Sequence, residues 1–145
     1  MAYTTLNIPT NGERFYNITE NVKNALENIL NDNKGKSGSG ILHLFTTHTS
    51  CALTISEAYD PAAAKDVERF FKHLAPRDLN FITHTDEGED DSPSHMKSVL
   101  LNQNLSFIVD EKKLILGTWQ GIYLAEFRDA NKKREVLVKF VPDQA

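Results

Sequence analysis

Hydrophobic and polar residues alternate along much of the chain, the pattern of β-strands with one buried face. The segments that carry it are residues 3–8, 15–18, 41–45, 51–55, 105–109, 114–116, 119–127 and 136–140. Some of these strands, such as 119–127, are apolar at successive positions, which indicates burial on both faces. The sequence therefore predicts a domain rich in β-structure.

Three segments instead show helical spacing of apolar residues. The first spans residues 22–30. The second begins at Asp60-Pro61, where a capping carboxylate precedes a proline at the first helical position, and ends before Pro76. The third is predicted to start with Ser92 as its cap. Strands interleaved with helices in this order predict an α+β domain.

Length and composition are those of an ordinary globular protein. The 145 residues, 40% hydrophobic and 25% charged, predict a single domain over residues 1–145. Five acids between residues 86 and 91 account for the charge, since removing them from the net charge of −4 leaves +1. The nearly neutral remainder gives no indication of a nucleic-acid partner.

No segment approaches the roughly 20 apolar residues that a membrane-spanning helix needs. The first ten residues lack the basic and apolar regions of a signal peptide, so we expect a cytoplasmic protein without a membrane partner. Cys51 is the only cysteine, which excludes an intramolecular disulfide and a thiolate-rich zinc site. Any metal must be bound by histidines and carboxylates.

Five histidines are available, and their positions in the predicted elements separate them. In a regular strand His43 and His48 have opposite parity, so their imidazoles do not meet. His73 lies within the second predicted helix and is expected to cover its edge. His48, His84 and His95 lie where a strand or helix meets a loop, which is where sites are commonly built.

His95 can be examined more specifically. If Ser92 caps the third helix, His95 lies in its first turn, where the helix dipole disfavours an imidazolium. The neighbouring acids favour it, and a divalent cation held by three imidazoles would reconcile the two effects. The alternative is three unrelated surface histidines beside a solvated acidic loop.

The start of the same helix is also a candidate anion site. Ser92, Ser94, Lys97 and Ser98, with the free backbone N–H groups, could bind phosphate. The alternative is an ordinary capped helix with a surface lysine.

Three further side chains are candidates that depend on the fold. Glu57 follows a strand and would act as a general base if it reached the metal; otherwise it is a solvated carboxylate. Gln120 and Arg128 share a strand face and would contact a polar ligand only if that face lined a cleft.

Three blocks, taken together, resemble the signatures of the YjbQ-like family, also called the secondary thiamine-phosphate synthase family. They are HTSCALTISEAYDP (48–61), HTDEGEDDSPSHMKS (84–98) and GTWQGIYLAEFR (117–128). The resemblance implies a two-sheet β-sandwich of about seven strands with flanking helices. It also implies a homotrimer around a threefold axis.

The resemblance further implies a metal site formed by His48, His84 and His95, with zinc as the first expectation and magnesium as the alternative for a diphosphate substrate. The implied activity condenses hydroxymethylpyrimidine diphosphate with thiazole phosphate to give thiamine phosphate and pyrophosphate, as a main or a weak side activity.

Within that reaction, Glu57 or Asp91 would orient or deprotonate a reactant. The turn from Ser94 to Ser98 would bind phosphate, while Lys97 and Arg128 would neutralise the leaving pyrophosphate. A zinc-dependent hydrolase with Glu57 as its base is one alternative. A trimeric metal- or metabolite-binding protein without catalysis is the other.

Overall fold

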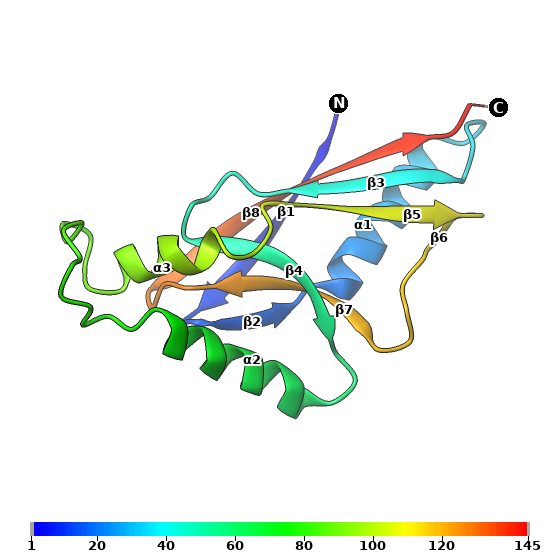
Figure 1. Cartoon of the computed structure of the whole chain (residues 1–145). Coiled ribbons are helices and arrows are strands. Elements are labelled where there is room, and N and C mark those ends of the chain that lie inside the picture. The colour runs from blue at the N-terminus through cyan, green and yellow to red at the C-terminus, as the bar shows by residue number, and fades with distance from the viewer. Residues whose placement is uncertain (1, 145) are drawn as a thin grey trace.

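Two antiparallel sheets pack face to face (Figure 1), and the computed structural model describes residues 2–144. The five-stranded sheet has the order β1 (Thr4–Asn11), β8 (Asn131–Pro142), β3 (Gly40–Phe45), β5 (Asn104–Asp110), β6 (Lys113–Leu114). The three-stranded sheet has the order β2 (Arg14–Asn17), β7 (Gln120–Glu126), β4 (Cys51–Glu57). The predicted α+β sandwich is confirmed, with eight strands rather than seven because the short β6 also pairs.

The main core lies between the two sheets. Alternation places Leu42 and Leu44 of β3 inside, opposite Leu53 of β4, and all three are fully buried. The helix α1 (Thr19–Asp32) packs Val22 and Leu26 against the same core. Both sheets and this helix therefore share one hydrophobic core. The apolar residues that fill it recur at every second position in the strands and at helical spacing in α1.

A second core lies on the other face of the three-stranded sheet, where the helix α2 (Pro61–Leu74) covers it (Figure 1). Phe71 of α2 packs against Phe15 and Phe127, with ring centroids 5.7 and 5.8 Å apart. The three-stranded sheet is thus buried on both faces, which explains the continuous apolar run in β7.

The start of α2 matches its prediction and the start of α3 does not. Asp60 caps α2 by accepting a hydrogen bond from the Ala62 N–H at 2.9 Å. The helix α3 (Asp91–Ser98) begins before Ser92, with Asp90 as N-cap. His95 consequently lies in the second turn of α3, so its predicted position in the first turn was wrong.

The outer face of the five-stranded sheet is open. Ile41 on this face lies opposite Ile108 on one neighbouring strand and Val141 on the other. All three are at least 36% exposed. His43 shares the face and contacts Ser106, well separated from the interior, as its parity predicts.

Among the helices within residues 2–144, none is both long and apolar enough to cross a membrane.

Candidate metal-binding pocket

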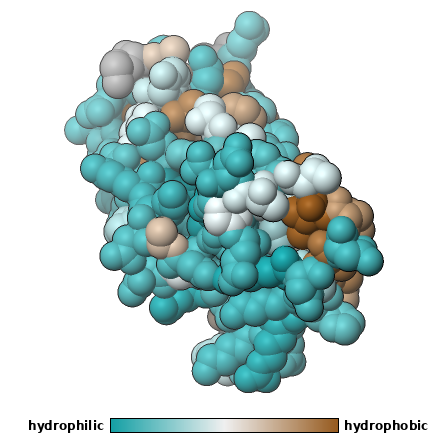
Figure 2. Space-filling view, turned by 90° about the vertical axis from the view of Figure 1, so that its left-hand side faces the viewer, coloured by the Kyte–Doolittle hydropathy of each residue, from teal (hydrophilic) through white to brown (hydrophobic). Residues whose placement is uncertain are grey.

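A pocket of about 590 Å³ opens where α3 meets the loop after β3. This end of the molecule faces the viewer in Figure 2 and is largely hydrophilic, although hydrophobic side chains gather at its right-hand side. The residues that line the pocket are His48, Thr49, His84, Ser92, His95, Ser98, Val99 and Gln103. The three histidines selected from the sequence therefore line one cavity.

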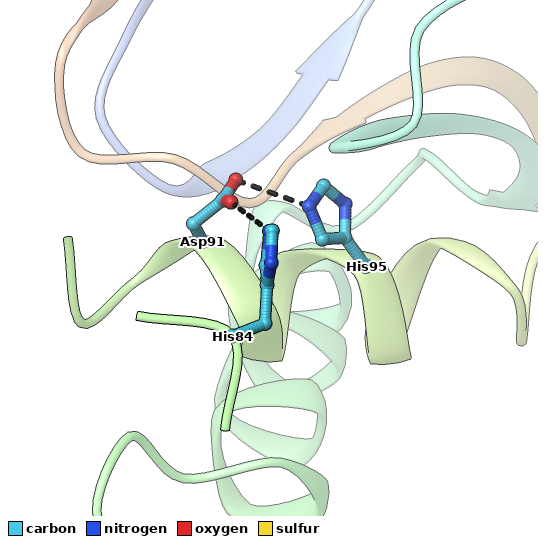
Figure 3. Close-up of side chains that lie close together, drawn as sticks. All are labelled: His84, Asp91 and His95. Carbon is cyan, nitrogen blue, oxygen red and sulfur yellow. Dashed lines mark hydrogen bonds and ion pairs between the residues drawn. The ribbon is translucent and has the colours of Figure 1, made fainter. Parts of the chain in front are cut away.

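Two of these histidines converge on one buried carboxylate (Figure 3). His84 Nε2 lies 2.8 Å from Asp91 Oδ2, and His95 Nε2 lies 3.2 Å from Asp91 Oδ1. One ligand atom from each residue lies within 4.8 Å of the others. Two imidazoles and a carboxylate form a donor set suited to a divalent cation.

Helix geometry and one loop contact bring these groups together. Asp91 and His95 are four residues apart, so they lie on the same face of α3. His95 Nδ1 lies 2.8 Å from the carbonyl oxygen of Thr49, which accepts hydrogen bonds only. Nδ1 therefore carries a proton, and Nε2 is the nitrogen that faces Asp91. Metal-binding histidines commonly have this arrangement.

Asp91 is ionised in this setting. Burial raises the pKa of its carboxyl, but the neighbouring His95, Arg128 and His84 together hold that pKa below its usual value. The guanidinium of Arg128 already supplies one positive charge to this carboxylate, while the Nε2 atoms of His84 and His95 face it from the other side. A divalent cation would satisfy all three groups at once.

Arg128 positions the acidic side of the cluster. Its Nη1 donates to Asp91 Oδ1 at 2.8 Å, its Nε to Asp90 Oδ2 at 3.0 Å and its Nη2 to the Glu87 carbonyl at 2.9 Å. Arg128 was predicted to bind a ligand directly. In this structure three of its nitrogens are bonded to protein groups, and these contacts hold the Asp91 carboxylate in place.

His48 lies in the pocket but outside the cluster. Its Nε2 accepts a hydrogen bond from the backbone N–H of Glu135 at 3.0 Å. Among residues 2–144 the clustered donors are His84, Asp91 and His95 alone. The third member of this cluster is therefore Asp91 and not His48.

The predicted phosphate-binding turn is not formed. Lys97 is buried, its Nζ lies 2.6 Å from Glu13 Oε2, and it packs over the Phe127 ring. Ser94 is also buried and donates to the backbone oxygen of Asp91. Both side chains are therefore directed toward protein partners. Of the four predicted side chains, Ser92 and Ser98 line the pocket.

Glu57 and Gln120 lie at the other end of the three-stranded sheet. They pair with each other across β4 and β7, and β4 is about 20 Å long at about 3.3 Å per residue. Glu57 accepts from the Asp60 N–H, and Gln120 accepts from the Gly117 N–H. Within this chain neither reaches the pocket.

Sequence reasoning missed a buried ion pair behind the pocket. Arg134 Nε and Nη2 lie 2.7 and 2.6 Å from the carboxylate of Glu126, which is fully buried. Arg134 Nη2 also donates to Ser50 Oγ, and Glu126 accepts from the Arg128 N–H. The pair thus ties the loop bearing His48 to Arg128. The sequence contains one sign of this ion pair, which is a single acidic residue within the otherwise apolar run of β7.

The carboxyls around Arg128 predict a loss of stability in acid. Burial raises the pKa of Asp90 and of Asp91, but their hydrogen bonds and charge partners lower each pKa on balance. Each therefore contributes stability that is present above about pH 4 and is lost as the pH falls through the folded-state pKa.

We expect the free energy of unfolding, measured with urea at pH 7, 4 and 3, to fall over this range. Arg128→Gln should flatten the dependence by weakening both pairs. The same slope in both proteins would contradict the assignment.

A two-sheet α+β sandwich with a histidine–carboxylate cluster in a pocket defines a class of candidate metal-binding proteins. The family model described as "UPF0047 protein YjbQ-like" matches residues 4–143, and the chain belongs to this family. The UPF0047 protein YjbQ of Escherichia coli O157:H7 is 37% identical over 133 residues, covering 92% of each chain. UPF0047 protein sll1880 of Synechocystis is 34% identical, covering 90% of this chain and 85% of that protein.

Solved structures show the same fold. A conserved hypothetical protein from Thermus thermophilus is 37% identical with a TM-score of 0.81. A YjbQ/UPF0047 family protein from Clostridium acetobutylicum is 30% identical with a TM-score of 0.82. Each comparison covers 95% of this chain and 99% of the other.

Proposed function

We propose that this protein is a metal-dependent enzyme acting on a phosphorylated small molecule. The observation that carries the proposal is the cluster of His84, Asp91 and His95 beside a 590 Å³ pocket. Zinc suits two imidazoles and a carboxylate, and magnesium is the alternative that would accompany a diphosphate. The bound cation would supply charge neutralisation at a phosphate oxygen.

The composition of the pocket supports a ligand whose charge is balanced by that cation. None of the eight residues that line the pocket is lysine or arginine. The nearest arginine in the cluster, Arg128, is already bonded to Asp90 and Asp91. A phosphate entering the pocket would therefore depend on the metal for its electrostatic stabilisation.

The specific reaction proposed is that of a thiamine-phosphate synthase, in which hydroxymethylpyrimidine diphosphate and thiazole phosphate give thiamine phosphate and pyrophosphate. This reaction depends on stabilising a leaving pyrophosphate more than on a protein nucleophile. His84, Asp91 and His95 would hold the cation, and Arg128 would keep Asp91 oriented. The pocket offers no additional carboxylate as a general base, which weighs against the hydrolase alternative.

Formation of thiamine phosphate by the purified, untagged protein tests this proposal. Zinc- or magnesium-loaded protein should form product, while chelator-treated protein and His95→Ala should not. His43→Ala changes a histidine on the open sheet face and is the matched control. Metal and pyrophosphate binding without turnover of these substrates would favour the binding-protein alternative instead.

We further propose that the chain forms a homotrimer through the open face of the five-stranded sheet. Ile41, Ile108 and Val141 form a continuous exposed apolar stripe there, which a second copy of the chain would bury. Mass photometry should give three times the chain mass of 16.4 kDa. Ile108→Asp should give monomers, whereas Phe70→Asp, at an exposed apolar residue of α2, should not.

A monomeric wild-type protein would contradict this assembly. Equal disruption by both substitutions would contradict the choice of face.

A further inference from the structure

The hydrogen bond to His48 fixes which of its ring nitrogens carries the proton of the neutral ring. A backbone N–H only donates, so the His48 Nε2 that receives the Glu135 N–H at 3.0 Å must hold a free electron pair. The proton of the neutral ring is therefore on Nδ1. No hydrogen bond within residues 2–144 uses that Nδ1, and His48 lines the pocket.

The surroundings of His48 keep the ring neutral. Burial lowers its pKa, and the buried cation of Arg134 lowers it further, against the opposing effects of Glu135 and Glu126. A neutral ring whose Nε2 is engaged has no free electron pair to offer a metal. What it offers to the pocket is an N–H.

Ser98 supplies a second donor in the same pocket. The residue is 1% exposed, and its Oγ has no hydrogen-bond partner among the described residues. A buried hydroxyl without a partner costs free energy that a bound acceptor would recover. Ser98 follows the metal-binding cluster by one turn of α3, since His95 is three residues before it.

We propose that His48 Nδ1–H and Ser98 Oγ–H are ligand-binding donors for an anionic oxygen of a diphosphate, and that His48 is not a metal ligand. The assignment rests on the proposed function, because it takes the cation to be held by His84, Asp91 and His95. Neutral donors in a partly buried pocket suit an oxygen whose charge a cation already balances. Because the eight residues that line the pocket include no lysine or arginine, these two hydrogen-bond donors orient the bound oxygen.

Histidine ¹⁵N NMR of the full-length protein tests the assignment directly. We expect His48 to carry its proton on Nδ1, which distinguishes it from a ring protonated on Nε2. Added Zn²⁺ should shift the Nε2 signals of His84 and His95 and leave His48 nearly unchanged. Inorganic pyrophosphate, added next, should shift the Nδ1 signal of His48 but not the signals of His43.

Substitutions give a second measurement by calorimetry. His48→Ala should change the Zn²⁺ dissociation constant less than about threefold, while weakening pyrophosphate binding to the zinc-loaded protein by about 10-fold or more. Ser98→Ala should weaken pyrophosphate binding in the same way. His48→Asn retains an N–H near the Nδ1 position and should recover part of the affinity.

Zinc bound to either nitrogen of His48, or pyrophosphate affinity unchanged in both variants, would overturn the proposal. If zinc does not bind at all, the proposed function fails separately. Pyrophosphate added as its magnesium complex, in which a cation already balances the charge, then decides the donor pair, since a shift of His48 Nδ1 supports it and no shift overturns it.

Discussion

Asp91→Asn is expected to lower zinc affinity by more than about 100-fold, because it removes the anionic donor from the cluster. The amide keeps the shape of the side chain, but it lacks the negative charge that faces His84 and His95 at 2.8 and 3.2 Å. Arg128 then keeps its pair with Asp90 but loses the one with Asp91, so its positive charge next to the cluster is less compensated and further disfavours a cation. Zinc titration against a chelator of known affinity measures the change.

Asp86→Asn is the matched control for this experiment. Asp86 is an exposed acid in the loop that precedes α3, so its substitution alters net charge equally without touching the cluster. We expect its zinc affinity to match wild type. An equal loss in both variants would mean that general loop charge, and not the donor geometry of Asp91, attracts the metal. Product formation should follow zinc affinity in both variants.

Local patterns predicted most of the fold. Leu42 and Leu44 alternate with exposed neighbours in β3, and Asp60-Pro61 starts α2 through interactions within three residues. Such signals are contained in short windows of sequence, so they could be interpreted directly. The start of α3 was misplaced because Asp90 and Asp91 are held by Arg128, which is 37 or 38 residues away.

The candidate site was only partly predictable for the same reason. His84 and His95 were selected from their positions at boundaries, and both lie in the cluster. The role of His48 depends on the N–H of Glu135, 87 residues away in the chain. Lys97 was predicted to bind phosphate or to lie on the surface, but its pairing with Glu13 across 84 residues buries it. The periodicity of apolar residues along the chain does not show which polar side chains, far apart in the sequence, come into contact.

The second large effect is expected at the buried ion pair, where Glu126→Gln should lower the free energy of unfolding by about 3 kcal/mol or more. The substitution leaves the Arg134 guanidinium, only 5% exposed, without its counterion. It also weakens the acceptor that serves Thr10 and the Arg128 N–H. Urea unfolding followed by circular dichroism measures the loss.

Two further variants separate the cost of an unpaired buried charge from the value of any ion pair. Arg77→Gln removes a pair between more exposed groups, Arg77 and Asp129, and should cost less than about 1 kcal/mol. Glu126→Met combined with Arg134→Met removes both buried charges, so it should cost less than Glu126→Gln alone. A double variant less stable than the single one would show instead that the hydrogen bonds of Arg134 to Ser50 dominate. In that case the pair would act mainly by holding the loop that carries His48.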